Sequence, residues 1–159
     1  MSDTDTHFLH QAIELARDNM AQGGRPFGAV VVRGGEVLAT GVNEILATHD
    51  PTAHAEMSAL RAASRRLGSP DLSGCAVYAS GHPCPMCLAA MRLAGVVRVA
   101  YAYSNEEGAP FGLSTAAIYE DLAKPLAEQS MHIRHLPVPR PDLYAQWAQA
   151  QAQARNRKA

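Results

Sequence analysis

Two short motifs limit, more than any other feature, how this chain of 159 residues can fold. HAE occupies residues 54–56 and PCPMC occupies residues 83–87. Each motif stands where turn residues and apolar spacing predict the start of a helix, and the apolar run at 75–80 predicts one strand between them. Two helices connected through a single strand can lie side by side with both N-termini at one edge of a sheet. A fold that brings the motifs together must therefore place these two helix starts next to each other.

The rest of the chain alternates between helical and strand patterns. Apolar spacing, β-branched runs and glycine or proline breaks predict a helix over 5–21, a hairpin over 28–42 turning at Gly34-Gly35, a helix from 50 to about 67, a strand over 75–80, a helix over 83–94, a strand over 96–103, a short helix over 117–122, a strand over 132–136 and a helix from 141 through 147. Residues 104–116 are expected to form a loop. This order predicts one α/β domain over residues 1–159, a three-layer α/β/α sandwich with a central mixed five-stranded sheet.

Charge and cysteine content exclude several classes of protein. The net charge is −1, so the chain offers no basic field for a long nucleic-acid backbone, and we do not expect nucleic acid as a partner. The N-terminus, MSDTDTHF, is polar and acidic, unlike a secretion signal, and no apolar run reaches the length of a membrane span. We therefore expect a cytoplasmic protein that does not engage a membrane and whose three cysteines stay reduced.

Cys84 and Cys87 have the spacing of a zinc half-site. Residues three apart on a helix share a face, and the free N–H groups and dipole at a helix start favour thiolates. Two other interpretations compete, a pair of small buried residues and a redox dithiol. The redox interpretation fits less well, because in thioredoxin-like chains the CxxC pair follows the first strand of a βαβ unit.

His54 supplies the other half of a metal site. Alone at a helix start, a histidine is more often a surface or capping residue. Beside the cysteine half-site it completes a set of one imidazole and two thiolates and leaves a fourth position open. Structural zinc sites use four protein ligands, whereas catalytic sites keep one position for water or substrate. The three ligands therefore predict a catalytic Zn²⁺ site.

Glu56 follows His54 by two residues, which on a regular helix would turn its side chain to nearly the opposite side. Both side chains can approach one metal only if the site lies beyond the helix end. There Glu56 would stand beside the activated water and carry its proton. The competing interpretation is a first-turn glutamate that stabilises the helix dipole. Taken together, the motifs form the H-x-E…P-C-x-x-C signature of zinc deaminases.

Four segments extend this signature to a resemblance over most of the chain. They resemble the cytidine-deaminase-like zinc deaminases, and most closely the bacterial guanine deaminases. The resemblance implies a cytidine-deaminase-like fold, Zn²⁺ on the three ligands, a small heterocyclic amine as substrate, and a homodimer. The segments are RPFGAVVV at 25–32, GVNE at 41–44, HDPTAHAEMSALRAA at 49–63 and PCPMCLAAM at 83–91.

The resemblance also implies the reaction and further site residues. Water activated at the zinc adds to the ring carbon that carries an exocyclic amine, Glu56 shuttles the protons, and ammonia leaves. Asn43 and Phe27 are expected to contact the heterocycle, and the backbone N–H near Ala55 to support the developing charge. Turn formation after the strand is the alternative role for Asn43, and core packing is the alternative for Phe27.

Three features depart from the guanine deaminase pattern. His82 stands where these enzymes commonly have Glu, so it is expected either to contact a different substrate or to cap the following helix. Residues 112–115, Gly-Leu-Ser-Thr, align with a Gly-Phe-Asp-Asp sequence that includes an Asp used in guanine recognition. The tail after Trp147 contains no aromatic residue of the kind that often covers a neighbouring site. The zinc motif is kept, while the parts that read guanine differ.

These departures leave more than one function open. The first interpretation is a zinc-dependent hydrolytic deaminase of a free nucleobase or similar amino-heterocycle, like guanine deaminase or acting on a cytosine, isocytosine or triazine type of ring. The second is a tRNA-specific adenosine deaminase, which shares the motif but needs phosphate contacts from Lys and Arg. The third is a non-enzymatic zinc site closed by a fourth protein ligand, for which His82 is the candidate.

Overall fold

A computed structural model describes residues 3–157 of the chain. The chain divides into two compact units, Met1–Lys124 and Pro125–Ala159. The first unit holds the sheet and all of the candidate site residues. The second holds the short 3₁₀ helix η2 (Leu126–Glu128) and the helix α7 (Leu143–Asn156). The prediction of one domain over residues 1–159 stays a prediction.

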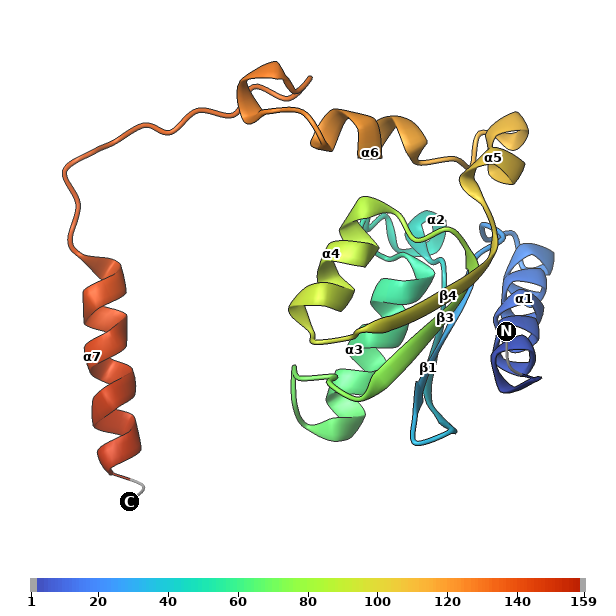
Figure 1. The fold of residues 1–159 in the computed structure, drawn as a ribbon, viewed down its shortest axis with the longest axis horizontal. Coiled ribbons are helices and arrows are strands. Elements are labelled where there is room, and N and C mark those ends of the chain that lie inside the picture. Colours follow the sequence, from blue (N-terminus) through green and yellow to red (C-terminus); the bar gives the residue numbers. More distant parts are fainter. Residues whose placement is uncertain (1–2, 158–159) are drawn as a thin grey trace. The chain divides into compact units, whose positions relative to one another are not determined.

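A mixed four-stranded sheet forms the centre of the first unit (Figure 1). β1 pairs antiparallel with both β2 and β3, whereas β3 and β4 run parallel. The parallel pair is connected through the helix α4 (Pro85–Leu93), as parallel neighbours require a crossover. The strands, in the order β2-β1-β3-β4, are β2 (Glu36–Val42), β1 (Gly28–Arg33), β3 (Cys75–Gly81) and β4 (Arg98–Tyr103).

Helices cover both faces of this sheet and give three layers (Figure 1). α1 (Asp3–Ala21) packs on one face, and α3 (Ala55–Leu67) packs on the other face beside α4. The side chains of β1 alternate between the two resulting cores. Val30 and Val32 join the cluster under α1, whereas Ala29 and Val31 join the cluster under α3 and α4. The predicted three-layer α/β/α sandwich is therefore confirmed.

Glycine is required at two places in the hairpin. Gly34 and Gly35 have φ angles of 60° and 83°, the left-handed region that a tight hairpin turn of this hand needs. Gly41 in β2 meets a different demand, because a Cβ there would lie 2.3 Å from the carbonyl oxygen of Ala55 and 2.5 Å from the nitrogen of Ala59. The backbone of α3 therefore rests directly on β2 at its first turn.

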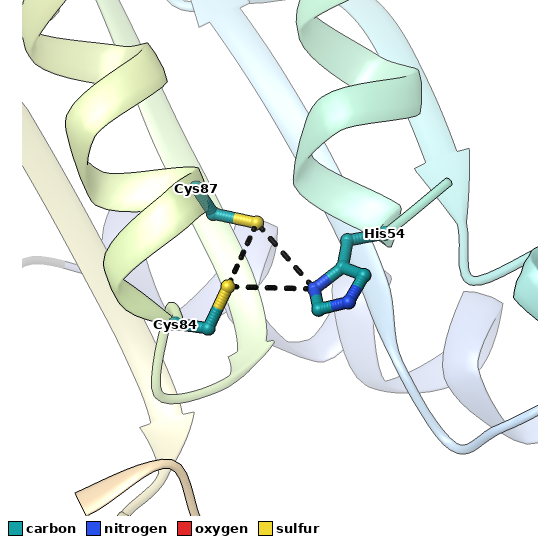
Figure 2. A group of neighbouring side chains, drawn as sticks. All are labelled: His54, Cys84 and Cys87. Carbon is teal, nitrogen blue, oxygen red and sulfur yellow. Dashed lines mark hydrogen bonds between the residues drawn. The ribbon is translucent and has the colours of Figure 1, made fainter. Parts of the chain in front are cut away.

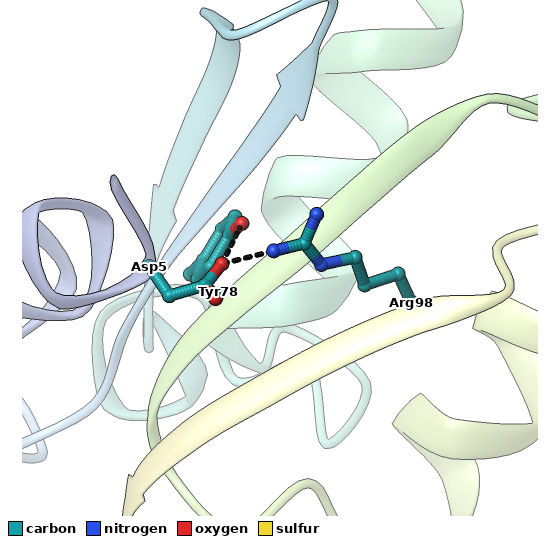
Figure 3. Close-up of polar contacts among 3 residues, drawn as sticks. All are labelled: Asp5, Tyr78 and Arg98. Atoms are coloured by element: carbon teal, nitrogen blue, oxygen red, sulfur yellow. Dashed lines mark hydrogen bonds and ion pairs between the residues drawn. The ribbon is translucent and has the colours of Figure 1, made fainter. Parts of the chain in front are cut away.

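A polar contact fixes the start of α1 to the sheet (Figure 3). The hydroxyl of Tyr78 in β3 donates to Oδ1 of Asp5 at 2.7 Å, and Arg98 of β4 forms an ion pair with the same oxygen. Burial raises the pKa of Tyr78, and its hydrogen bond to Asp5 acts in the same direction. Three elements are thus linked at one point on the α1 face of the sheet.

The segment predicted as a loop, residues 104–116, contains the short helix α5 (Asn105–Gly108) and the 3₁₀ helix η1 (Ala109–Phe111), and leads into α6 (Ala116–Leu122). Ser104 opens α5 with a capping box. Its hydroxyl accepts from the N–H of Glu107 at 3.3 Å, and the Glu107 carboxylate accepts from the N–H of Ser104 at 2.8 Å. This segment is therefore an ordered part of the first unit.

One predicted strand is absent, and the bounds of two predicted helices are wrong. The strand expected over 132–136 is not formed, so the fold class is confirmed with four strands rather than five. The segment alternates like a strand, but Ile133 and Leu136 are exposed, and it pairs with no strand within residues 3–157. The helix expected from residue 50 begins at Ala55, and α7 continues well past Trp147.

The residues before α3 form a turn instead of helix. The Asp50 carboxylate accepts from the N–H of Thr52 at 2.8 Å, an aspartate turn that competes with helix formation. The single-turn helix α2 (Ile45–Thr48) precedes it. Among residues 3–157, no helix combines the length and apolar character that crossing a membrane demands.

Candidate metal centre and active site

The two motifs stand at the starts of α3 and α4, where each helix has just left extended backbone. His54 is the residue before α3, with φ −72° and ψ 155°, and Cys84 is the residue before α4, with φ −69° and ψ 166°. Both side chains therefore project from outside the helix. Cys87 and Glu56 lie in the first turns. This geometry removes the difficulty that His54 and Glu56, two residues apart, would face opposite ways on a regular helix.

Three ligand atoms converge between the helix starts (Figure 2). His54 Nδ1 lies 3.5 Å from the sulfur of Cys84 and 3.7 Å from that of Cys87, and the two sulfurs lie 3.5 Å apart. Ligands placed tetrahedrally on zinc at ordinary Zn–S and Zn–N bond lengths are separated by roughly 3.5–3.8 Å. The donor set and its spacing therefore fit Zn²⁺.

The group of potential metal ligands at this point, within residues 3–157, consists of His54, Cys84 and Cys87. His82, the candidate for a fourth ligand, is not part of it. Instead its ring stacks on Tyr101, with ring centroids 4.5 Å apart and an interplanar angle of 24°. Three protein ligands match the composition of catalytic zinc sites, and this counts against the interpretation as a closed structural site.

The two thiols shift each other's pKa in opposite directions. The hydrogen bond from the Cys87 thiol, with a further contribution from His54, lowers the pKa of Cys84 to about 4. The same bond raises the pKa of Cys87, because donating to Cys84 stabilises its protonated form, and burial adds to this. The hydrogen bond to Cys84 also raises the pKa of His54. Within the protein alone, the thiolate form is thus favoured at Cys84 and disfavoured at Cys87.

Glu56 is buried beside these ligands, with 7% of its surface exposed. Burial raises the pKa of its carboxyl, and the nearby Cys84 sulfur adds to the shift. A raised pKa brings a carboxylate closer to the range in which it can both accept and release a proton. Glu56 also lines the same pocket as His54 and Cys84.

A pocket of about 110 Å³ opens at the metal centre. Phe27, Asn43 and His82, three of the four residues expected to contact substrate, line it. Ala55, the fourth, is not among the lining residues and is buried as the first residue of α3. The structure thus brings the predicted side chains together, and any contribution of Ala55 would come from its backbone N–H.

Asn43 takes part in the turn after β2 and also lines the pocket. It is buried, with 4% of its surface exposed, and its side-chain oxygen accepts from the N–H of Ile45 at 3.3 Å, which is turn chemistry. Its own N–H donates to the carbonyl of Phe27 at 3.1 Å and so joins two pocket residues. No hydrogen bond within residues 3–157 uses its amide NH₂ group. That donor therefore remains available on the wall of the pocket.

His82 is held at the edge of the pocket by aromatic neighbours. Besides stacking on Tyr101, its ring centroid lies 5.5 Å from that of Tyr119 in α6, and its backbone N–H donates to the carbonyl of Tyr103 at 2.8 Å. The residue also lines a larger neighbouring pocket of about 330 Å³ between α1 and α5. His82 therefore forms part of the wall between the two pockets.

Two other parts of the chain complete the pocket lining. Arg25, which the sequence did not single out, lines the pocket, and its positive charge opposes protonation of His54. Residues 112–115, which align with a substrate-recognition segment, close another side, with the Thr115 N–H bonded to Asn105 Oδ1 at 2.9 Å. The position of Arg25 two residues before Phe27 was its one signal in the sequence.

Comparison with known proteins agrees with the geometry of the site. The family model of the cytidine and deoxycytidylate deaminase zinc-binding region matches residues 2–103. Guanine deaminase of Bacillus subtilis (strain 168) is 41% identical over 125 residues, which cover 78% of this chain and 80% of that protein. A tRNA-specific adenosine deaminase of Aquifex aeolicus is 38% identical over 95 residues, which cover 60% of this chain and 63% of that protein.

A solved structure extends the similarity to the fold. The X-ray structure of guanine deaminase from Bacillus subtilis matches with a TM-score of 0.82 and 35% identity. The match covers 96% of this chain and 95% of that chain.

Proposed function

Because the chain belongs to the family defined by the cytidine and deoxycytidylate deaminase zinc-binding region, we propose that it hydrolytically deaminates a free nucleobase or a similar amino-heterocycle. The observation that carries this proposal is the convergence of His54, Cys84 and Cys87 beside the buried carboxyl of Glu56, all at one small pocket. The likeness to a guanine deaminase over most of both chains supports a small ring as the substrate.

His54, Cys84 and Cys87 would hold the zinc, which supplies the Lewis acidity that makes water nucleophilic near neutral pH. Glu56 takes the proton that water loses when its oxygen adds to the ring carbon bearing the amine. It delivers this proton to the adjacent ring nitrogen and then assists protonation of the amine, so that the C–N bond breaks and ammonia leaves. The ring keeps the oxygen as a carbonyl, and Glu56 ends in its starting state.

The remaining pocket residues orient the ring. In this proposal the free NH₂ group of Asn43 donates to a ring oxygen or nitrogen, and the Phe27 ring walls the heterocycle; both residues line the pocket. The backbone N–H of Ala55, at the positive end of α3, supports negative charge as it develops. A pocket of about 110 Å³ is small beside typical ligand sites of roughly 300 Å³ or more, which favours a free base over a nucleoside.

The matching test is ammonia release from a panel of amino-heterocycles by the zinc-loaded protein. The panel contains guanine, cytosine, isocytosine, adenine, aminopterins and aminotriazines, each with its nucleoside where one exists. We expect release from one class of free ring and none from the same panel with the Glu56→Gln variant. If the zinc-loaded protein released no ammonia from any ring of the panel, that result would contradict the proposal.

A tRNA-specific adenosine deaminase is the second candidate, favoured by the similarity to the Aquifex aeolicus protein. The net charge of −1 weighs against it, because neutralising phosphates requires Lys and Arg. An adenosine-containing RNA stem-loop in the same assay separates the two. Inosine formation in the stem-loop, with an affinity that falls steeply with salt, would replace the small-base proposal.

We propose a homodimer in the cytoplasm as the working state. Leu93 at the end of α4 and Val97 before β4 are 90% and 91% exposed, and Tyr101 on the edge strand β4 is 42% exposed. Adjacent apolar side chains beside an open strand edge are typical of a protein interface.

A charge in this patch should separate the subunits, so Val97→Arg is expected to reduce the mass measured by light scattering from two chains to one. An unchanged dimeric mass would place the contact elsewhere.

A further inference from the structure

The pocket carries a positive charge that the mechanism does not use. Arg25 lines it together with His54 and Glu56, and it is exposed, as a residue at the mouth of a pocket would be. Its backbone carbonyl accepts from Asn19 and from the Phe27 N–H. Its guanidinium has no hydrogen-bond or ion-pair partner within residues 3–157. Five N–H donors are therefore available at the entrance of the pocket.

The pocket lining holds few groups that could neutralise this charge. Glu56 is the sole carboxylate of the lining, and it is committed to proton transfer. Ser114 accepts from the N–H of Ala116 at 3.3 Å, so its own hydroxyl hydrogen remains free to donate. A heterocycle bound here meets donors from Arg25, Ser114 and the Asn43 amide. Such surroundings favour a substrate edge rich in acceptors over one rich in N–H groups.

Resting on the deaminase function proposed above, we propose that Arg25 selects amino-heterocycles that bear an anionic group on the ring, a carboxylate or an ionised oxo group. A planar guanidinium can bind such a group through two parallel N–H···O bonds. The small volume of the pocket favours an anion attached directly to the ring over the more distant phosphate of a nucleotide. Neutral guanine offers the acceptors O6 and N7 to a guanidinium, but its N–H groups would find no free carboxylate in this pocket.

Two matched pairs of probes test this assignment. Isocytosine is compared with isocytosine-6-carboxylate, and pterin with pterin-6-carboxylate, by ammonia release and by calorimetric binding to the catalytically inactive Glu56→Gln protein. We expect the carboxylate to be preferred in kcat/KM and in affinity by at least about tenfold in one pair. Arg25→Gln should remove that preference, because it lowers kcat/KM and affinity for the carboxylate more than for the neutral member. Arg33→Gln, at the far end of β1, is the control and should behave as the parent protein.

The outcomes separate this inference from the proposed function. Deamination of neutral rings with equal or poorer use of their carboxylates, unchanged by Arg25→Gln, would overturn the role of Arg25 and leave the deaminase function standing. A preference for a nucleoside 5′-monophosphate over both ring acids would overturn the assignment of a ring-borne anion. Failure of the zinc-loaded protein to release ammonia from these probes and from every ring of the panel above would reject both proposals together.

Discussion

Glu56→Gln is expected to lower ammonia release by about 10²- to 10⁴-fold, the usual contribution of a general acid–base group. Glutamine keeps the size and polarity of the buried side chain but cannot take a proton from water or return it to the ring. The three zinc ligands are untouched, so zinc content should remain at one ion per chain. Turnover on the best substrate of the panel and metal analysis of the same samples check the two halves of this prediction.

The control for Glu56→Gln is Glu36→Gln, which makes the same change at an exposed residue beyond the hairpin turn. It should retain the turnover of the parent protein. Near-normal turnover in the Glu56→Gln variant would assign Glu56 to the alternative role, a first-turn glutamate that stabilises α3. Loss of zinc along with turnover would show that Glu56 supports the metal site rather than the chemistry.

Cys87→Ser should remove both zinc and activity. Cys87 is fully buried, and its sulfur lies 3.5 Å from that of Cys84, so the substitution exchanges a thiolate ligand for a poorly coordinating hydroxyl at the same place. We expect the affinity for zinc to fall by more than about a hundredfold, since even changes around metal ligands cost 10- to 100-fold. Zinc titration of the metal-free protein measures this loss directly.

Thermal unfolding gives an independent readout of the Cys87→Ser variant. A ligand that binds only the folded state at 100 times its Kd stabilises that state by about 2.7 kcal/mol, so zinc should raise the melting temperature of the parent protein. The rise should vanish in Cys87→Ser and persist in Cys75→Ser. Cys75 is also buried but lies at the start of β3, outside the ligand group. An equal zinc-dependent rise in all three proteins would place the metal elsewhere.

Most of the first unit could be predicted because its local signals agree with its packing. The alternation of β1 between two cores, the Gly34-Gly35 turn and the apolar spacing of α1 are each visible in the sequence and each stabilised by the tertiary structure. The strand predicted at 132–136 failed because alternation describes only the side chains, whereas a strand also needs a hydrogen-bonding partner. The predicted start of α3 was too early because the Thr52 N–H donates to the Asp50 carboxylate, and this hydrogen bond forms a turn in place of the first helical turn.

The candidate site likewise contains residues that could be predicted from local sequence and residues that could not. The three potential metal ligands could be predicted from their spacing together with the H-x-E…P-C-x-x-C signature, because His54 and Cys84 directly precede helices whose starts meet. The surroundings of His82 could not be predicted, since its ring neighbours Tyr101 and Tyr119 come from separate elements. The position of Arg25 in the pocket likewise depends on tertiary contacts between segments that are distant in the sequence, and no short motif predicts such contacts.

The contact of Gly41 with α3 matters for how variants of this protein are interpreted. A side chain at residue 41 would press on the backbone of Ala55, the neighbour of His54, although residue 41 carries no reactive group. The Gly41→Val variant could therefore lose zinc and activity while its sheet remains intact. A genetic screen would group this variant with substitutions of the metal ligands, and excess zinc would not restore its activity. The absence of a side chain at Gly41 is therefore as necessary for catalysis as the metal ligands themselves.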